Sequence, residues 1–179
     1  FNGHEVVKEY YVNDYGSQVK NFVKSVYFRI LEILKKREFT YDKDLYPGDY
    51  VIDIAKKIIL EKKLINFNNL EKIYDELEIE SLKFAMNLIK KNLSMLGVRH
   101  DSFIHESDLI KKNIVEKTIN KLKQNDHVYY GKLSAPKVEN SDSWIPRKQI
   151  LFKSTKFGDD MDRALQKQDN TWTYFAGDI

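Results

Sequence analysis

The sequence predicts an α/β protein, because strand-like and helical stretches alternate along it. Runs of β-branched and aromatic residues, which favour strands, occur near both ends and around residue 130. Between these runs, apolar residues recur every three or four positions, which is the spacing of an amphipathic helix. The predicted strands lie far apart, so long and mainly helical segments must connect them.

The N-terminal stretch is predicted to form a strand and a helix. Residues 4–12 are rich in valine and tyrosine and precede "VNDYG", which is typical of a turn. A helix follows over residues 17–37, because its apolar residues repeat with helical spacing. Ser17 or Asn13 is predicted to cap this helix.

Two further helices are predicted in the next part of the chain. The segment "LYPGDY" breaks the chain, and Asp49 is predicted to cap a helix over residues 50–63. Residues 64–80 are polar and asparagine-rich, and are predicted to be a connector that can include a short helix. A third helix is expected over residues 80–96, with Gly97 at its C-terminus.

The second half of the chain contains shorter predicted elements. Residues 98–107 are predicted to form a strand and a turn, and residues 110–125 to form a helix. Short strands are expected at 127–133 and 149–155. The segment 134–149 contains prolines and several polar residues, and is predicted to be irregular.

The last part of the chain is predicted to form a β-hairpin. The sequence "RALQKQDNTWTYFA" places Asp169 and Asn170 at the turn, where a residue with positive φ is needed. The second strand of this hairpin is expected over residues 171–176.

Charge and composition exclude several classes of protein. The net charge of +3 is too small to indicate nucleic acid binding by itself, but residues 83–137 hold 11 Lys and Arg against 5 Asp and Glu. This basic segment is either a solvated lysine-rich face or a surface that attracts phosphate. The absence of cysteine excludes disulfides and thiolate metal sites, and it fits a reducing compartment. No apolar run approaches the ~20 residues that span a membrane.

The sequence predicts no metal site. The segment "FGDDMD" contains Asp159, Asp160 and Asp162, whose carboxylates could hold Mg²⁺ or simply form a solvated turn after Gly158. We favour the turn, because neither EF-hand spacing nor a phosphate-binding loop is present. The four histidines are His4, His100, His105 and His127. None of them lies in an HExxH motif or a His-x-His pair, which are typical of zinc sites.

Tyr174 and Asp178 are the candidate ligand-binding residues. Asp178 follows a predicted strand at its carboxyl end, where open α/β sheets bind ligands. Its carboxylate could accept a bidentate hydrogen bond from a guanidinium, while Tyr174 could supply an aromatic wall and a hydroxyl. Alternatively, Asp178 only caps a following helix. The pattern by itself leaves both interpretations open.

Four stretches of the chain, taken in order, resemble segments of arginyl-tRNA synthetases, which are class I enzymes. They are "GHEVVKEYYVNDYGSQ" (3–18), "YPGDYVIDIAKKI" (46–58), "LGVRHDSFIHES" (96–107) and "LFKSTKFGDDMDRALQKQDNTWTYFAGDI" (151–179). The insertion "LSAPKVENSDSWIPRKQILF" resembles the form found in many alphaproteobacterial members. The resemblance covers nearly the whole chain.

The resemblance implies a partial Rossmann-type class I synthetase catalytic domain with a helical and β connective insertion. Residues 1–37 would belong to the catalytic core, as a strand plus a helix. Residues 38–149 would form the helical connective region and insertion, including some core elements. Residues 150–179 would form a hairpin and a core strand that ends at the arginine pocket. We expect an internal segment of a longer enzyme that is inactive alone, with cut strand edges that favour self-association.

The resemblance also implies the parent's reaction and its participants. The parent would activate L-arginine with ATP and transfer it to tRNA(Arg), with ATP and Mg²⁺ as substrates that the segment alone does not bind tightly. The parent would be a cytoplasmic monomer. Tyr174 and Asp178 match the residues that line the family's arginine pocket, and no residue here is assigned a catalytic role. Asn13, Asp14 and Gln18 lie in a matching segment that is predicted to border the active-site cleft.

Two departures from the family pattern and two other hypotheses remain. Gly177 stands where the family usually has alanine, which is expected to loosen the corner that positions Asp178. Asn170 replaces the usual turn glycine, which is acceptable because Asn also tolerates positive φ. The chain could instead be a synthetase-like module that binds RNA or a partner without catalysis, or a structural helical insertion. An HxGH motif within about 30 residues upstream would favour the enzyme.

Overall fold

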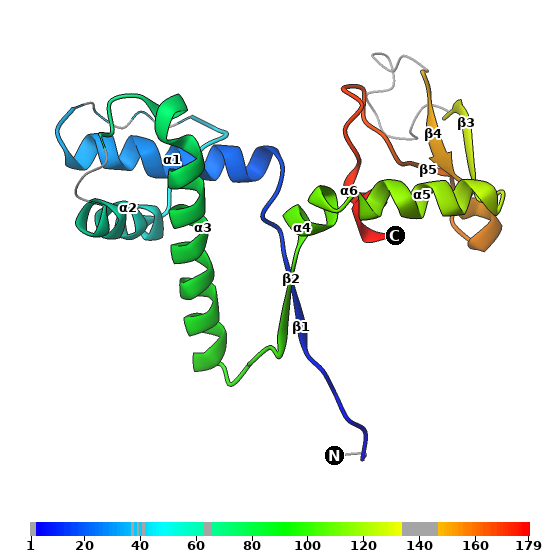
Figure 1. Ribbon diagram of the computed structural model, residues 1–179, viewed down its shortest axis with the longest axis horizontal. Coiled ribbons are helices and arrows are strands. Elements are labelled where there is room, and N and C mark those ends of the chain that lie inside the picture. Colours follow the sequence, from blue (N-terminus) through cyan, green and yellow to red (C-terminus); the bar gives the residue numbers. More distant parts are fainter. Residues whose placement is uncertain (1–2, 37, 39, 41, 63–65, 134–146) are drawn as a thin grey trace. The chain divides into compact units, whose positions relative to one another are not determined.

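The computed structural model describes residues 3–36, 38, 40, 42–62, 66–133 and 147–179. Among these residues the structure is a mixed α/β arrangement of helices and small sheets (Figure 1). The chain divides into two compact units, Phe1–His105 and Glu106–Ile179.

The helices of the first unit pack through the apolar faces that their periodicity predicts. α1 (Ser17–Ile33) and α2 (Asp49–Glu61) contact each other, and both contact α3 (Leu70–Met95) (Figure 1). Fully buried aliphatic side chains each contribute about 1.5–3 kcal/mol, so this shared core holds the helices together. Its buried members are Val19, Phe22, Val23, Val26, Tyr27, Ile30, Leu31, Val51, Ile54, Ala55, Ile58, Phe67, Leu77 and Phe84.

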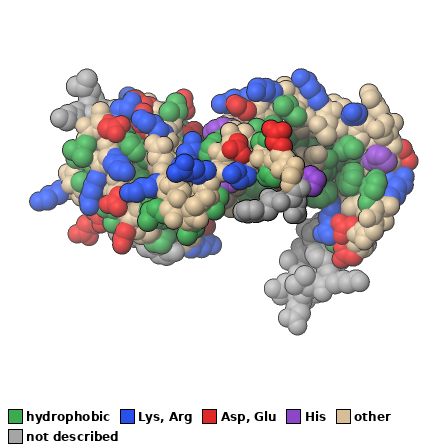
Figure 2. All heavy atoms as spheres, turned by 90° about the horizontal axis from the view of Figure 1, so that it is seen from below, with side chains coloured by type: hydrophobic (Ala, Val, Ile, Leu, Met, Phe, Trp, Pro, Cys, Tyr) green, Lys and Arg blue, Asp and Glu red, His purple; other side chains and the backbone are tan. Residues whose placement is uncertain are grey.

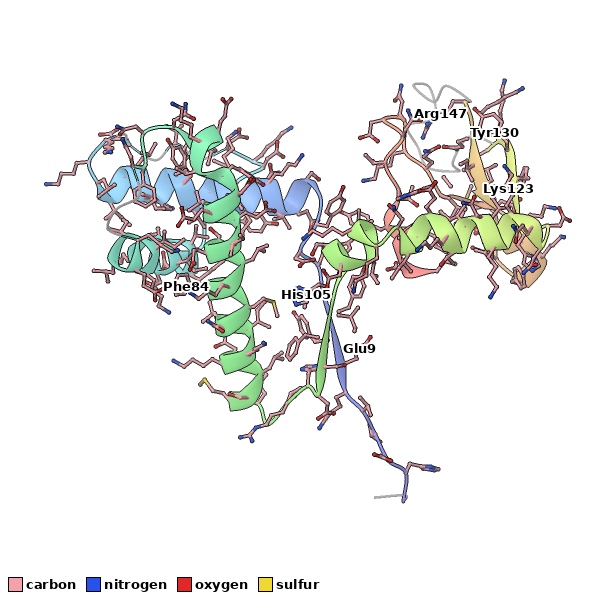
Figure 3. The ribbon with its side chains drawn as sticks, viewed as in Figure 1. Glu9, Phe84, His105, Lys123, Tyr130 and Arg147 are labelled. Carbon is pink, nitrogen blue, oxygen red and sulfur yellow. The ribbon has the colours of Figure 1, made fainter. Side chains whose placement is uncertain are left out.

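α3 is longer than the sequence predicts. It begins at Leu70 and includes most of the segment that was predicted to be a connector. The side chain of Asn69 accepts a hydrogen bond from the backbone N–H of Lys72 (3.3 Å) and so caps the helix. Leu77 and Phe84 then face the core of the unit, and Phe84 is labelled in Figure 3. The Nζ of Lys57 on α2 lies 5.7 Å from the ring centroid of Phe84.

The predicted caps of α1 and α2 are wrong in detail. The N-cap of α1 is Gly16, whose φ of 95° favours glycine, and no side chain caps the helix there. Ser17 is the first residue of α1, which ends at Ile33 rather than at residue 37. Asp49 is the first residue of α2 and not its cap. An acidic residue in a first turn still interacts favourably with the helix dipole.

A pair of parallel strands completes the first unit. β1 (Glu9–Val12) pairs with β2 (Ser102–His105), so that Glu9 lies opposite Ser102 and Val12 opposite His105. Glu9 and His105 are labelled on this pair in Figure 3. The strand predicted over residues 4–12 is therefore restricted to its last part. Because the strands are parallel, their carboxyl ends lie at the same edge.

The predicted helix over residues 110–125 is divided in the second unit. α4 (Glu106–Lys111) ends before Asn113, and α5 (Ile114–Gln124) begins after it. Asn113 has a φ of 53°, in the left-handed region, so it cannot continue a right-handed helix. Asparagine tolerates this conformation better than most residues, which explains the break.

An antiparallel sheet packs on α5. β3 (Val128–Lys132) pairs with β4 (Lys148–Phe152), which pairs with β5 (Arg163–Ala164). Lys123, Tyr130 and Arg147 are labelled in Figure 3, on α5, on β3 and next to β4. The buried core of this unit contains Val115, Ile119, Val128, Leu165 and Ala176.

The strand predicted over residues 149–155 ends early. β4 stops at Phe152, and a 3₁₀-helix, η2 (Ser154–Phe157), follows it. Most of the segment that was predicted to be irregular, residues 134–146, lies outside the described residues.

Candidate functional site

The hairpin predicted near the end of the chain is present and is well braced. Gln166 pairs with Trp172, and the backbone N–H of Lys167 donates to the carbonyl of Thr171 (2.8 Å). Asn170 has a φ of 64°, which confirms its predicted role at the turn. Asp169 completes the turn, because its carboxylate accepts hydrogen bonds from the N–H and hydroxyl of Thr171 (3.0 and 2.6 Å).

The strand predicted over residues 171–176 is wrong beyond Thr173, because among the described residues pairing across the hairpin involves only Thr171, Trp172 and Thr173. Residues Tyr174–Asp178 form a short helix, α6. Thr173 starts it, since its hydroxyl accepts from the N–H of Ala176 (3.2 Å) and donates to the carbonyl of Ala164 (2.8 Å). The corner at which a strand would present Asp178 is therefore absent from this segment.

The helix nevertheless brings the two candidate residues closer together. Tyr174 and Asp178 are four residues apart, and side chains with this spacing lie on one face of a helix, with about 5–6 Å between Cβ atoms. In a strand the same spacing would separate them by about 13 Å. Both side chains are exposed, with Tyr174 at 53%. One small ligand could therefore contact both.

The opposite side of α6 is anchored in the core of the second unit. Ala176 is 4% exposed and belongs to the cluster that α5 and β3 form. Phe175 packs against the ring of Phe152, with 5.9 Å between centroids. The face that carries Tyr174 and Asp178 is thus held by packing on the other side of the same turn.

Asn13, Asp14 and Gln18 follow β1 in the first unit. Asn13 and Gln18 are exposed, whereas the Asp14 side chain is only 10% exposed. The Oδ2 of Asp14 lies 2.7 Å from the Nδ1 of His105 at the end of β2. His105 was not predicted to have a role in a site. Asp14 follows β1 and His105 ends β2, but only the parallel pairing of these two strands places the residues together, and the local sequence does not show that pairing.

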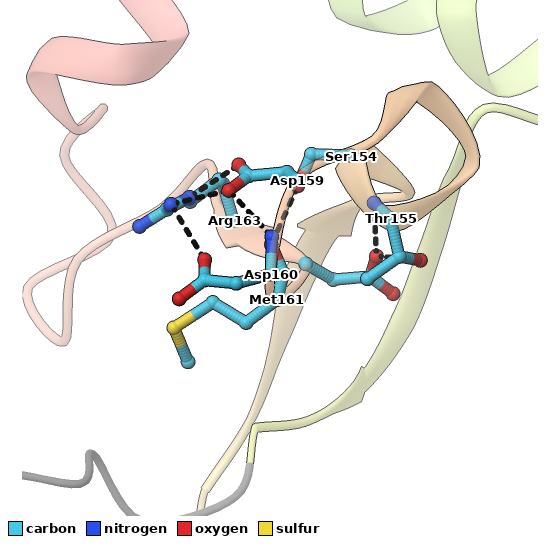
Figure 4. A network of polar contacts seen from close by, with 7 residues as sticks. Ser154, Thr155, Asp159, Asp160, Met161 and Arg163 are labelled. Carbon is cyan, nitrogen blue, oxygen red and sulfur yellow. Dashed lines mark hydrogen bonds and ion pairs between the residues drawn. The ribbon is translucent and has the colours of Figure 1, made fainter.

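The carboxylates of the segment "FGDDMD", those of Asp159, Asp160 and Asp162, accept hydrogen bonds from other protein groups. The guanidinium of Arg163 donates to Asp159 from Nε (2.7 Å) and Nη2 (2.6 Å), and Nη2 also donates to Asp160 (3.0 Å) (Figure 4). Asp162 accepts from the hydroxyl of Tyr129 (2.8 Å). Chiefly through these Arg163 bonds, the pKa of Asp159 is held well below its usual range. These contacts support the interpretation of the loop as a structural turn.

The histidines lie in separate environments. His100 packs against Tyr10 and Phe103, with 5.2 and 6.0 Å between ring centroids, and His127 packs edge-on against Phe157 (5.4 Å). Within the described ranges, no three His, Cys, Asp or Glu side chains are grouped so that they could hold a metal ion.

The surface shows mixed charge on the faces that Figure 2 displays. Lys and Arg side chains are scattered there among acidic, apolar and other groups. In the part of the chain that the structure describes, no helix is both long enough and apolar enough to cross a bilayer.

Known proteins resemble this chain over its whole length. The arginine–tRNA ligase of Pelagibacter ubique is 54% identical over 180 aligned residues, which cover 100% of this chain and 31% of the ligase. The arginine–tRNA ligase of Anaplasma phagocytophilum is 48% identical, over 99% of this chain and 30% of the ligase. The chain is homologous to arginine–tRNA ligases. This confirms the resemblance that the sequence motifs predicted.

A solved structure gives the same result for the fold. A crystal structure from Campylobacter jejuni that bears the name arginyl-tRNA synthetase matches 98% of this chain and 35% of its own, with a TM-score of 0.78 and 26% identity. The mixed α/β arrangement is thus similar to part of an arginyl-tRNA synthetase. No protein-family profile matches the sequence. The chain spans about a third of the length of the arginine–tRNA ligases that it matches.

Proposed function

We propose that this chain is a segment of a longer arginine–tRNA ligase. The observation that carries the proposal is the identity of up to 54% with arginine–tRNA ligases along the entire chain. The parent would form arginyl-adenylate from L-arginine and ATP, release pyrophosphate, and pass the arginyl group to tRNA(Arg). The segment alone would be inactive, since it corresponds to about 30% of such enzymes.

Positioning and charge stabilisation would provide most of the catalysis in this reaction. Mg²⁺ would enter with the phosphates of ATP rather than in a protein cage. The paired state of Asp159 and Asp160 supports this, because their oxygens already accept hydrogen bonds from Arg163.

The carboxylate of Asp178 would recognise the guanidinium of the substrate by accepting its hydrogen bonds, and Tyr174 would orient the substrate. A planar, permanently charged fork matches a carboxylate better than it matches a neutral group. This assignment is supported by the exposed face of α6 that Tyr174 and Asp178 share, and by the buried contacts of Ala176 that hold the helix in place. If Asp178 served only as a cap for a following helix, its replacement would leave the selection of arginine unchanged.

The parallel pair β1–β2 would belong to a Rossmann-type core. Asn13, Asp14 and Gln18 follow β1 and would border the active-site cleft at its carboxyl edge. The proposed regions remain 1–37, 38–149 and 150–179, for the core, the connective region and the pocket segment. The parent would be a cytoplasmic monomer, whereas the isolated segment would self-associate through its open strand edges.

Aminoacylation by the full-length protein tests the proposal. Charging of tRNA would be measured with each of the twenty amino acids for wild type, Asp178→Asn and the control Asp108→Asn, another exposed aspartate. We expect arginine alone to be charged, with kcat/KM reduced on the order of 100-fold in Asp178→Asn and unchanged in the control. Unaltered kinetics in Asp178→Asn would overturn the pocket assignment. Failure to charge any amino acid would favour an RNA- or partner-binding module.

A further inference from the structure

The ammonium group of Lys167 lies over the aromatic ring of Tyr174. The Nζ of Lys167 lies 5.2 Å from the centroid of this ring, within the range of a cation–π interaction. The hairpin fixes this neighbourhood, because the backbone N–H of Lys167 donates to Thr171 and the N–H of Thr173 donates to Leu165 (3.0 Å). The contact therefore follows from the turn that precedes α6.

The same ring is the one that would face the arginine guanidinium. Ammonium and guanidinium groups are attracted to the same negative face of an aromatic ring, and guanidinium also stacks on it. We propose that Lys167 is an intramolecular competitor of the substrate: its ammonium occupies Tyr174 in the free enzyme and leaves when arginine binds. This inference rests on the proposed function, since it concerns the same site.

A second partner for the displaced ammonium lies on the same hairpin. The carboxylate of Asp169 has a pKa held below its usual value, first by the hydrogen bonds from Thr171 and also by the charge of Lys167. The ammonium of Lys167 thus interacts with the charge of Asp169 as well as with the ring of Tyr174. Lys167 can leave the ring without losing all electrostatic stabilisation.

The expected effect on substrate binding is small and uniform. If only the fraction of protein with a free ring binds ligand, the apparent dissociation constant rises by the reciprocal of that fraction. A cation–π contact at an exposed site gives a factor of about two to five. The factor is the same for every ligand that needs the ring, because the competition is internal to the protein.

Steady-state kinetics of the full-length protein separate competition from a structural role. We expect Lys167→Met to lower the KM for arginine about two- to fivefold, with kcat unchanged, and to lower the inhibition constant of agmatine by the same factor. Lys167→Arg, which retains a cation for the ring, should raise KM or leave it unchanged. Lys148→Met, at another exposed lysine of this unit, should have no effect. In a Tyr174→Ala background, Lys167→Met should change nothing further.

Other outcomes would overturn the inference. A higher KM or a lower kcat in Lys167→Met, restored by Lys167→Arg, would show that Lys167 supports the site rather than competes for it. An unchanged KM in Lys167→Met, together with impaired Asp178→Asn, would leave the arginine site standing but remove the competitor. If the protein charges no arginine, the proposed function and this inference both fail.

The contact itself can be checked in the 179-residue chain. The ring current of Tyr174 should shift the side-chain ε protons of Lys167 upfield in NMR spectra, and Tyr174→Ala should abolish the shift. Random-coil shifts for these protons in the unmutated chain would contradict the inference.

Discussion

The Nδ1 of His105 lies 2.7 Å from the Oδ2 of Asp14, which joins the ends of two neighbouring parallel strands. The Asp14 side chain is 10% exposed and that of His105 is 44% exposed, so the pair is partly shielded from solvent. A contact between segments 91 residues apart restrains the loop that follows β1. This loop carries the residues that are proposed to border the active site.

Removal of this contact should lower stability. We expect His105→Ala to reduce the free energy of unfolding by about 1 kcal/mol, as for a typical intramolecular hydrogen bond. Urea unfolding of the 179-residue chain would measure it, with the exposed His4→Ala as control. In a double-mutant cycle with Asp14→Ala, the coupling energy should be at least ~0.5 kcal/mol. Additive effects of the two substitutions would show that the pair contributes nothing.

A second prediction concerns Glu80 on α3, whose side chain is 11% exposed. Its carboxylate lies 3.0 Å from the Nζ of Lys83 and 3.2 Å from that of Lys62, which follows α2. Chiefly the hydrogen bond from Lys83, and then that from Lys62, lower the pKa of Glu80 despite its burial. The folded state therefore takes up this proton less readily than the unfolded state does.

The resulting stabilisation is complete above the unfolded-state pKa of about 4.5 and is lost as the pH falls through the lower folded-state value. We expect the free energy of unfolding to decrease on acidification below pH 4.5 by a smaller amount in Glu80→Gln than in wild type. Glu38→Gln, at an exposed position, should retain the wild-type pH dependence. Parallel curves for wild type and Glu80→Gln would contradict this prediction.

A third prediction concerns Asp162, which links β3 to the 3₁₀-helix. It accepts hydrogen bonds from the Tyr129 hydroxyl (2.8 Å) and from the hydroxyl of Thr155 (2.7 Å). Burial raises the pKa of Asp162, but these donors outweigh burial and lower it overall. Tyr129→Phe should cost about 0.5–1.5 kcal/mol of stability, measured by thermal or urea unfolding.

The neighbouring Tyr130 provides a matched control. Its side chain is 68% exposed, so Tyr130→Phe should be close to neutral. Equal losses in the two variants would mean that the bond to Asp162 is not the cause.

The sequence patterns identify some elements well because one physical signal dominates them. The apolar positions of α1 and α2, such as Val26 and Ile54, recur with helical spacing and are buried as predicted. The start of α3 was missed because three asparagines, Asn66, Asn68 and Asn69, precede it and acidic residues are frequent in its first turns, so composition suggested a connector. Its helical spacing, from Leu70 through Leu77 to Phe84, becomes decisive only when partners cover one side.

The candidate site illustrates the limits more sharply. A short run such as "TWTYFA" satisfies both strand and helix preferences, so periodicity cannot assign it. Tertiary contacts determine which of the two structures forms, because the hydroxyl of Thr173 donates a hydrogen bond to the carbonyl of Ala164 and Thr173 caps α6. The pairing of Asp14 with His105 and the position of Lys167 over Tyr174 depend on contacts between separate segments. Local sequence gives no direct signal for them.

Gly177 offers a final test of how α6 supports the site. It lies inside α6 and is not among the glycines with positive φ, so alanine fits its backbone conformation. Glycine inside a helix costs roughly 0.5–1 kcal/mol relative to alanine. Gly177→Ala should therefore raise the free energy of unfolding by about that amount and slow hydrogen exchange of the α6 amides. Because a firmer helix holds Tyr174 and Asp178 together, the KM for arginine in the full-length protein should fall or stay the same.

Replacement of Gly158 by alanine should lower the free energy of unfolding, in contrast to Gly177→Ala. Gly158 has a φ of 94°, and although a Cβ there would meet no atom within 4 Å, the backbone conformation itself is strained for alanine. Gly158→Ala should lower stability, typically by 1–2 kcal/mol. Destabilisation by both substitutions would imply that Gly177 is required for packing, so that the exposed face of α6 depends on close approach rather than on helix propensity. Stabilisation at Gly177 together with destabilisation at Gly158 would show that local backbone preference governs this part of the chain.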